Sequence, residues 1–570
     1  MKTKATIDIC EVKTMKKIII ATIAVFLILA GQALATDTCT DCCMLPTAQG
    51  NGLGGDWNNA MGWNVKSGST FKRGSTYWLG GGTYVPMALS TTCTGSCGTV
   101  TIKKATAGGT ACNSGTAGWS AAYGTDQAVI NSSDPAGQAS VIFSSNYWVL
   151  DGITNGGWVG AGYGIKLTTS TNAHTHDIMY AAINTHASYI TVRNTWIKGY
   201  GSTLYACEVG VENEAENPGN NNLVQSNLFE SLSNPIVWHS DTDDVVDGNY
   251  FLPVWGGGPA ACHQETITGA GTYRITISNN IFNPGFIWVH DYSGGSGYNT
   301  GWKIYNNLFI GTGAGYSGDF VGCADDGITH PDIFRNFEVH HNTIINWGNT
   351  GVAVTCYMTS ATAYPTYVYN NLFVNSGVTL ASGEDLNPIV PDYNAFYNST
   401  TTPAEAHANT SIAADPFVND TTPPYDLHLK DATAGTNAQV SCGNNPPTTN
   451  PACQSPYNSD RDIVTRSATV PDAGAYEYAG GTTYYTLTVT APSYGSISSV
   501  DGYISCPGVC IVQYASGTGV TLTYAPPSSG AWKLTAWAGD CSGTTCLLAM
   551  SGPKGASVTE EKQYYLGVHH

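Results

Sequence analysis

Charged side chains are scarce in this chain of 570 residues. Only 11% of it is Asp, Glu, Lys or Arg, and 22 Lys and Arg stand against 41 Asp and Glu. There is no basic run and the formal net charge is −19, which argues against nucleic acids and anionic membrane surfaces as partners. Cations and neutral or cationic polymers stay open as partners.

Helical periodicity is also missing. No stretch of ten or more residues has apolar groups at three- and four-residue steps, which excludes helical repeat architectures. The 66 glycines, together with the low charge, favour a β-rich extracellular protein over a cytoplasmic enzyme.

The longest apolar run lies near the N-terminus. Lys17 precedes the apolar stretch 18–30, and the small residues at 33–35 are of the kind that a signal peptidase cuts. This predicts a secretory signal over residues 1–35, with Met15 as an alternative start, and no membrane span in the mature protein. We therefore expect the protein outside the cytoplasm: secreted, at the cell surface or in the periplasm.

Seventeen cysteines are present, and sixteen of them follow the predicted signal. An even number in an exported chain predicts disulfides. For the trio Cys39, Cys42 and Cys43 we favour disulfides over zinc, because no histidine lies nearby. Further bridges are expected where cysteines are close in sequence or occupy similar places in adjacent repeats: Cys442 with Cys453, Cys323 with Cys356, and local staples among Cys506, Cys510, Cys541 and Cys546.

A short phrase recurs seven times, as in LVQSNLFE from Leu223, ITISNNIF from Ile275 and YVYNNLFV from Tyr367. Its alternating apolar residues indicate strands, and its period of 22 to 35 residues predicts stacked units. A parallel β-helix fits both, with strands of successive coils about 4.8 Å apart. We expect each last asparagine to adopt the left-handed conformation at a corner and also to hydrogen-bond to its copies: Asn194, Asn227, Asn249, Asn280, Asn307, Asn342 and Asn371.

Four further phrases carry a family resemblance. Three lie in the first part of the chain: GSTYWLGGGTY from Gly74, VTIKKA from Val100 and YWVLDG from Tyr147. The fourth is a closing phrase, PDAGAYEY, from Pro471 to Tyr478. Together they resemble bacterial right-handed parallel β-helix proteins of the pectate-lyase-like superfamily over roughly residues 68–478. The resemblance implies the fold, and a fold does not fix a reaction.

The composition changes after Tyr478. Residues 479–483 form a linker, and the patterns GSIS, CPGVC and WAGDCSG that follow resemble one divergent internalin-type B-repeat. We expect a small disulfide-stapled all-β domain with a C-terminal tail over 484–570, acting as a surface or spacer module without chemistry of its own. The predicted fold class is thus all-β: a Cys-containing segment at 36–67, a right-handed parallel β-helix at 68–478, and this small domain.

Ionisable residues gather at one place in five consecutive repeats. Glu208, His239, His263, His290 and Asp319 each lie 10 to 14 residues after the asparagine of their repeat. More acids lie within a few residues of them: Glu212, Asp241, Glu265, Asp291, Asp325 and Asp326. The alternative is an ordinary solvated face, where acids reduce aggregation. Histidine among carboxylates favours a functional groove.

Strand alternation refines this groove. Because residues two apart on a strand point to one side, we expect His239 with Asp241, and His263 with Glu265, to face the same way. The same rule places Trp238 opposite His239, and Trp288 on the side of His290. Aromatic rings bind the apolar faces of sugars, so we assign Trp288 and Tyr292 to substrate binding, together with Asp319, Asp325 and Asp326.

Two reactions fit such a groove. β-Elimination on a uronate polymer needs a base, His263 or His239, and a positive charge beside the substrate carboxylate. Calcium could supply that charge, with Glu208 and Glu212 as its first candidate ligands and Asp241, Glu265 or Asp291 as others. Glycoside hydrolysis needs two carboxyl groups, and Glu265 with Asp241 or Asp291 is the pair to test.

The catalytic motifs of well-known relatives are mostly absent. Only Asp325-Asp326 matches the polygalacturonase pattern, and the arginines that precede ladder asparagines, such as Arg193 and Arg274, are expected on another side. The sequence therefore predicts a secreted β-helix protein that binds, and could cleave, an extracellular polysaccharide. A non-catalytic surface, adhesive or structural protein is the alternative.

Overall fold

The computed structural model describes residues 39–562, apart from some internal stretches. Those stretches are 64–70, 92, 94–96, 133–138, 155, 157–159, 170–179, 186, 200–207, 214–218, 253–264, 291–298, 312–319, 325–333, 357–364, 383–388, 400–401, 421–425, 431–457, 467–470, 479–483, 500–502, 507–509, 516, 528–531 and 545. The predicted signal and its cleavage site lie outside the described residues. None of the described helices is long and apolar enough to cross a membrane.

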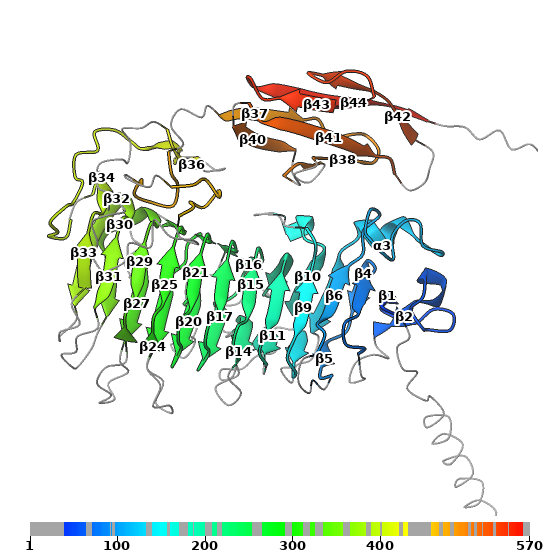
Figure 1. Cartoon of the computed structure of the whole chain (residues 1–570), viewed down its shortest axis with the longest axis horizontal. Coiled ribbons are helices and arrows are strands. Elements are labelled where there is room, and N and C mark those ends of the chain that lie inside the picture. The colour runs from blue at the N-terminus through cyan, green and yellow to red at the C-terminus, as the bar shows by residue number, and fades with distance from the viewer. Residues whose placement is uncertain are drawn as a thin grey trace, which may run out of the picture.

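The predicted parallel β-helix is confirmed. Short strands stack from one end of the molecule to the other, as Figure 1 shows from blue to yellow-green. Sheet A has 13 strands, and the pairings of its successive strands are parallel. They are β1 (Asp41–Leu45), β2 (Met61–Gly62), β3 (Thr76–Leu79), β6 (Val100–Lys104), β9 (Trp148–Asp151), β12 (Ile190–Arg193), β15 (Leu223–Gln225), β18 (Val245–Asp247), β21 (Thr276–Ser278), β25 (Lys303–Tyr305), β29 (Glu338–His340), β31 (Thr366–Tyr369) and β33 (Ile389–Asp392).

Sheet B has 19 strands and forms two rows. The first row holds β4 (Gly82–Tyr84), β7 (Ala128–Ser132), β10 (Ile165–Thr169), β13 (Thr195–Lys198), β16 (Leu228–Glu230), β19 (Tyr250–Leu252), β22 (Ile281–Phe282), β26 (Leu308–Ile310) and β34 (Ala395–Tyr397). The second row holds β5 (Met87–Leu89), β8 (Val141–Phe143), β11 (Tyr180–Thr185), β14 (Glu208–Asn213), β17 (Asn234–His239), β20 (Ile267–Ala270), β23 (Ile287–His290) and β27 (Val321–Ala324). The strands β30 (Thr343–Cys356) and β32 (Leu372–Ser382) run through both rows.

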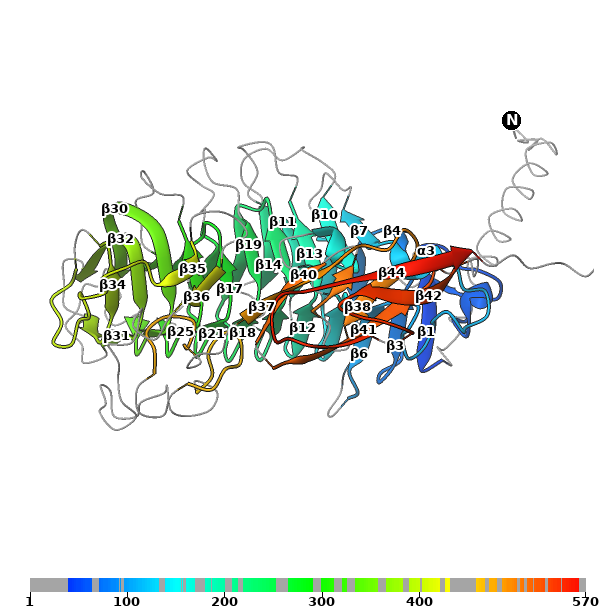
Figure 2. The ribbon, with the colours of Figure 1, turned by 90° about the horizontal axis from the view of Figure 1, so that it is seen from above.

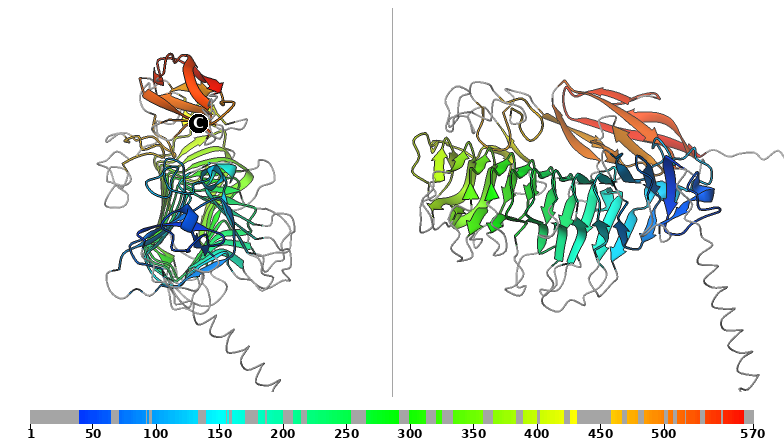
Figure 3. Two further views of the ribbon diagram at one scale, coloured as in Figure 1. Left: turned by 90° about the vertical axis from the view of Figure 1, so that its right-hand side faces the viewer. Right: turned by 60° about the horizontal axis from the view of Figure 1, so that its bottom comes forward.

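Each coil therefore has three faces around one interior, which the end-on view of Figure 3 shows. The inward residue of each strand stacks on its equivalent one coil away. The clearest stack is Phe229, Phe251, Phe282 and Phe309, whose ring centroids are 4.9, 4.9 and 4.5 Å apart. Aromatic stacks of this kind add to the apolar burial that stabilises the core.

The asparagine ladder is confirmed, with one correction. Six of the predicted asparagines are fully buried and bonded in series, and Asn394 continues the series beyond Asn371. In a typical step, Asn249 donates from its backbone N to Asn280 Oδ1 at 2.9 Å and from Nδ2 to the same oxygen at 3.0 Å. Asn194 does not belong to the ladder, because Thr195 takes that place and its N donates to Asn227 Oδ1 at 2.9 Å.

The expectation that one asparagine does both jobs was wrong. The residue before each ladder position turns the corner in the left-handed region, as at Ser226 (φ 55°), Asn279 (φ 56°) and His341 (φ 53°). Asn194, with φ 55°, is one of these corner residues. Two adjacent positions therefore have separate roles. The residue at the first turns the chain at the corner, and the side chain at the second hydrogen-bonds to its equivalent on the next coil.

A glutamate ends the ladder. Asn394 Nδ2 donates to Glu405 Oε2 at 2.7 Å, while Oε1 has no hydrogen-bond partner among the described residues. Burial raises the pKa of Glu405 from 4.5 to about 7. The stability that its protonated form contributes is thus fully present below about pH 4.5 and is lost as the pH rises through about 7.

Replacing this residue is expected to flatten the pH dependence of stability. Between pH 5 and pH 8 the natural protein should lose about 1 kcal/mol more than Glu405→Gln, after allowance for partial solvent screening. Denaturant midpoints of both proteins at these pH values measure the difference. Parallel curves for the two would show that Glu405 does not titrate in this range.

The C-terminal part of the β-helix region folds back over its own outer surface. Apolar residues on the outward side of the late strands of the first row pack against the hairpin β35 (Phe417–Asn419) and β36 (Asp426–Leu429). They also pack against the return segment, which is described at residues 458–466 and 471–478. The closing phrase PDAGAYEY belongs to this segment. Its Ala475 N donates to Thr343 Oγ1 at 2.9 Å, and its Gly474 N donates to Asn370 O at 2.8 Å.

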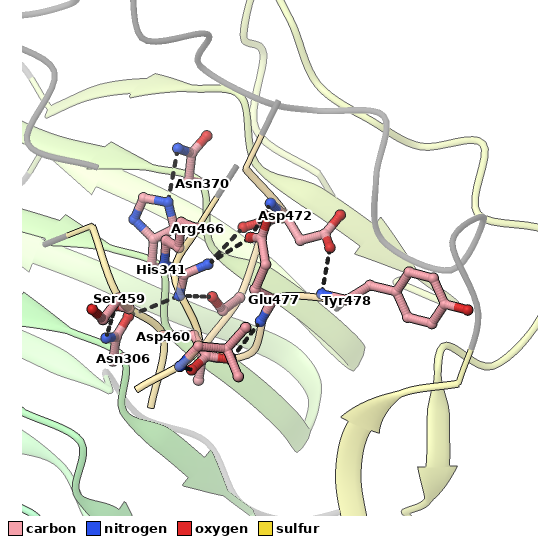
Figure 4. Close-up of polar contacts among 12 residues, drawn as sticks. Asn306, His341, Asn370, Ser459, Asp460, Arg466, Asp472, Glu477 and Tyr478 are labelled. Atoms are coloured by element: carbon pink, nitrogen blue, oxygen red, sulfur yellow. Dashed lines mark hydrogen bonds and ion pairs between the residues drawn. The ribbon is translucent and has the colours of Figure 1, made fainter. Parts of the chain in front are cut away.

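A buried arginine anchors the return segment (Figure 4). Arg466 donates through Nη2 to Asn306 Oδ1 and Gly474 O, both at 2.9 Å, and through Nη1 to Asp472 O at 3.1 Å. Its Nη1 also lies 3.4 Å from Glu477 Oε2. The two acids of the closing phrase accept hydrogen bonds from the backbone of the same phrase. Glu477 accepts from Asp472 N at 2.8 Å, and Asp472 accepts from Tyr478 N at 2.6 Å.

The C-terminal module, residues 484–562, is a separate all-β unit with its own core. One sheet contains β37 (Tyr484–Val489), β40 (Ile511–Ala515), β42 (Trp532–Gly539) and β44 (Lys554–Lys562). The other contains β38 (Ser496–Ser499), β39 (Ser505–Cys506), β41 (Gly519–Ala525) and β43 (Cys546–Ala549). Figure 2 shows its strands in orange and red. The resemblance to a B-repeat remains a prediction.

Disulfides occur at both ends of the described chain. They join Cys39 to Cys42, Cys43 to Cys112, Cys93 to Cys97, Cys506 to Cys510 and Cys541 to Cys546. Bridges of this number are typical of proteins outside the cytoplasm. The backbone register sets Cys323 opposite Cys356 on adjacent coils, but their side chains, like Cys442 and Cys453, lie outside the described part.

The remaining elements are small. They are the helices η1 (Trp57–Asn59), α3 (Ala121–Thr125) and η2 (Gly160–Gly162), and a two-stranded sheet of β24 (Asn299–Thr300) and β28 (Phe334–Arg335).

Candidate functional site

The second row of sheet B carries the predicted groove positions that the structure describes. Val211, Ile236, Ile267 and Ile287 point into the buried core, so the alternate residues face outward. The register sets Glu212 beside Val237, Val237 beside Thr268, Thr268 beside Trp288, and Trp288 beside Gly322. We call this line of residues the outward column. Within it Glu212 and Trp288 are partly exposed, while Val237 and Thr268 are buried, 1% and 5% exposed.

Trp288 is the large aromatic residue of this column. It is half-buried, and its six-membered ring lies where a side chain at Gly322 would be, 2.1 Å from a Cβ built there. The missing side chain of Gly322 lets the indole lean over the next coil. Phe286 meets it edge-on with centroids 6.3 Å apart. One rung earlier, the buried Thr268 Oγ1 has no hydrogen-bond partner among the described residues.

A second outward line contains histidines. The register pairs His239 with Ala270 and Ala270 with His290, so the two histidines occupy one line, two coils apart. At about 4.8 Å per coil their backbones are roughly 10 Å apart. His239 is partly exposed. Only the backbone of His290 is described, and the same holds for Glu208 at the start of β14.

Asp241 does not share a side with His239, which corrects the prediction from alternation. Ser240 adopts the left-handed conformation (φ 60°) directly after β17 ends, so the rule for continuous strands no longer applies. Asp241 is fully buried at the corner, where its Oδ1 accepts from Gly219 N at 2.9 Å and from Asn213 Nδ2.

Two buried carboxyl groups meet at this corner. Burial and the charge of Asp244 raise the pKa of Asp241 well above its ordinary value. Burial also raises the pKa of Asp244 to about 8, against its hydrogen bonds from Asn222. Burial thus favours the neutral form of both acids within the wall of the solenoid, where a polymer cannot reach them.

Glu265 also lies off the outward column. It precedes β20, is 7% exposed, and its Oε2 accepts from Asn234 Nδ2 at 3.3 Å. This pairing within the wall does not suit a carboxyl group that must meet a glycosidic bond. The other predicted groove residues lie outside the described part of the chain: His263, Asp291, Tyr292, Asp319, Asp325 and Asp326.

The described residues do not form a set of metal ligands. Among the residues that the structure describes, no group of three His, Cys, Asp or Glu side chains could hold an ion. Calcium takes six to eight oxygen ligands, and Glu212 is the one described side chain of the two proposed for it. Calcium therefore stays a prediction that depends on Glu208 and on residues outside the described part.

The sequence reasoning missed a cationic patch on the first row. Lys166 Nζ lies 4.2 Å and Lys198 Nζ 5.1 Å from the ring centroid of Trp196. Glu230 accepts from Trp196 Nε1 at 2.9 Å and from Lys198 Nζ at 2.5 Å. The alternating residues of IKLTT and TWIK predict outward lysines, but only the register shows that they meet across coils.

The comparisons with known proteins concern the fold. No family model and no curated protein matches the sequence. A solved structure, the crystal structure of pectate lyase Pel9A, is similar with a TM-score of 0.44 and 13% sequence identity, covering 78% of this chain and 97% of that one. The parallel β-helix itself is established by the strand pairings described above.

Proposed function

We propose that this protein binds an extracellular polysaccharide along the outward face of β14, β17, β20, β23 and β27. The observation that carries the proposal is the half-buried Trp288, whose ring lies over Gly322 on the next coil. An indole in that position offers a flat apolar surface for the C–H face of a sugar ring. The polar positions of Glu212 and His239 lie on the same face for the sugar hydroxyl groups.

The stacking of coils suits a polymer better than a small molecule. Successive coils lie about 4.8 Å apart along the axis, so an extended polymer lying along the row spans several coils and can reach both Trp288 and Glu212. The histidine line at His239 and His290 runs beside the outward column. A linear polysaccharide can use both lines at once.

Binding is better supported than cleavage. Asp241 and Glu265, two of the three acids in the proposed hydrolytic pairs, are buried in the wall. The burial of these acids therefore favours a non-catalytic binding or adhesive protein over a hydrolase. For a lyase, the base would be His239, or His263 outside the described part.

The test is a panel of neutral and uronic polysaccharides, with and without calcium. Trp288→Ala should weaken binding to the preferred polymer by about tenfold, which corresponds to roughly 1.4 kcal/mol. Trp196→Ala is the matched control, because Trp196 is also a half-buried tryptophan but lies on the first row. Its affinity should match that of the natural protein.

Product analysis in the same panel separates the reaction classes. Reducing ends with an unsaturated, absorbing product indicate a lyase, and reducing ends without it indicate a hydrolase. Binding to a polysaccharide without release of new reducing ends supports the non-catalytic, adhesive alternative. Equal affinities for Trp288→Ala and the natural protein, or no binding to any polymer, would overturn the proposed face.

A further inference from the structure

The C-terminal module carries an aromatic pair at one of its ends. The rings of Tyr494 and Trp532 stack with centroids 3.7 Å apart and an angle of 12° between their planes. Tyr494 is 45% exposed and Trp532 is partly exposed. Tyr494 comes from the turn between β37 and β38, and Trp532 is the first residue of β42.

A single carboxylate holds the turn that carries Tyr494. Glu560 on β44 accepts from Ser493 N at 2.9 Å and from Tyr494 N at 3.1 Å. The hydroxyl of Tyr524 lies 2.7 Å from Glu560 Oε1 and 3.0 Å from Tyr494 O. Burial and the hydrogen bond to Glu560 raise the pKa of Tyr524, so its hydroxyl keeps its proton.

The turn that presents Tyr494 is also closely packed. Gly495 has φ 83°, and a Cβ there would lie 2.3 Å from Ala525 O. Only glycine fits such a position without strain. The ring of Tyr494 is therefore held on a rigid turn, which lowers the entropy lost when a ligand binds.

The charges of the module indicate what kind of ligand this surface suits. Lys533 pairs with Glu561 at 3.4 Å, and Lys554 pairs with Asp540 at 3.2 Å. Glu560 is already occupied by hydrogen bonds from the protein. Lys562, the cross-strand neighbour of Trp532, also has an interaction within the protein. Because the charged residues described beside the pair are engaged within the protein, a neutral ligand is favoured.

We infer that Tyr494 and Trp532 form a binding site for a neutral sugar ring of a polysaccharide. A rigid, partly exposed aromatic pair offers an apolar face to the C–H groups of the sugar. The Tyr494 carbonyl and the Tyr524 hydroxyl lie next to the ring of Tyr494, and polar groups of this kind orient a sugar through its hydroxyl groups. The module is then an anchor to neutral glycans, distinct from the face proposed on the β-helix and independent of it.

The test uses the full chain and neutral polymers of glucose, xylose and mannose, with a uronic polymer in parallel. Trp532→Ala should weaken binding to a neutral polymer by about tenfold. Tyr494→Ala, which keeps the backbone N–H that Glu560 accepts, should do the same. Tyr503→Ala is the control, because Tyr503 is 64% exposed on the same module but lies outside the pair.

The outcomes distinguish this site from the one on the β-helix. Loss through Trp532→Ala with no loss through Trp288→Ala supports the module site alone, and Trp532→Phe should bind within about threefold of the natural protein. The inference fails if no neutral polymer is bound, or if both aromatic variants bind like the natural protein. It also fails if these variants abolish self-association instead, which sedimentation would show.

Discussion

Replacing Asn307 with alanine is expected to lower the free energy of unfolding by about 4 kcal/mol. Its Nδ2 donates to Ile277 O at 2.9 Å, to Tyr305 O at 3.0 Å and to Asn342 Oδ1 at 2.9 Å. Its Oδ1 accepts from Asn280 N at 2.9 Å and from Asn280 Nδ2 at 3.0 Å. Alanine leaves these groups unpaired at a site that water does not reach, and each such loss costs about 1–3 kcal/mol.

Calorimetry or denaturant unfolding measures this loss. Asn398→Gly is the matched control, because Asn398 is exposed and makes one amide hydrogen bond, to Asn375 Oδ1 at 2.7 Å. Glycine also keeps its left-handed conformation (φ 50°) at little cost. The control should change stability by less than about 1 kcal/mol. If both variants unfolded alike, the ladder would not be a main source of stability.

Arg466→Met is expected to destabilise the return segment by about 4 kcal/mol. The substitution removes a buried guanidinium from Glu477, Asn306 and two carbonyl groups, and it leaves a carboxylate that is 6% exposed without its cation. Breaking a buried pair in this way costs about 3–5 kcal/mol. Release of the segment would also expose the apolar outer face under it.

Limited proteolysis reports this release locally, and calorimetry reports the whole loss. Cleavage within 458–478 should become much faster in Arg466→Met. The control is Arg274→Met, because Arg274 makes a two-point pair with Asp243 at 2.6 and 2.7 Å but is exposed. Surface pairs contribute about 0–1 kcal/mol. Unchanged proteolysis in Arg466→Met would mean that apolar contacts alone hold the segment.

The sequence predicted the stacked architecture because the repeating phrase has a local cause in strand alternation and corner asparagines. It could not tell the corner position from the ladder position, since both are asparagine at 279–280, 306–307 and 370–371. In the first phrase the two roles fall on Asn194 and Thr195, and the choice of Asn194 was wrong.

The candidate site was harder to predict because it depends on where strands end. His239 and Asp241 are two residues apart, but the left-handed Ser240 between them sends one outward and the other into the wall. The contact between Trp288 and Gly322 joins two adjacent coils and depends on the register of their strands. The spacing of the repeated phrases does not determine that register. The return of PDAGAYEY onto coils more than a hundred residues earlier has no local signal at all.

A crystal structure with an oligosaccharide of the preferred polymer tests the central claim most directly. We predict a sugar ring packed on Trp288, with the chain running along the axis of the coils toward Glu212. An oligosaccharide bound instead on sheet A or on the first row, with the Trp288 ring untouched, would contradict the account.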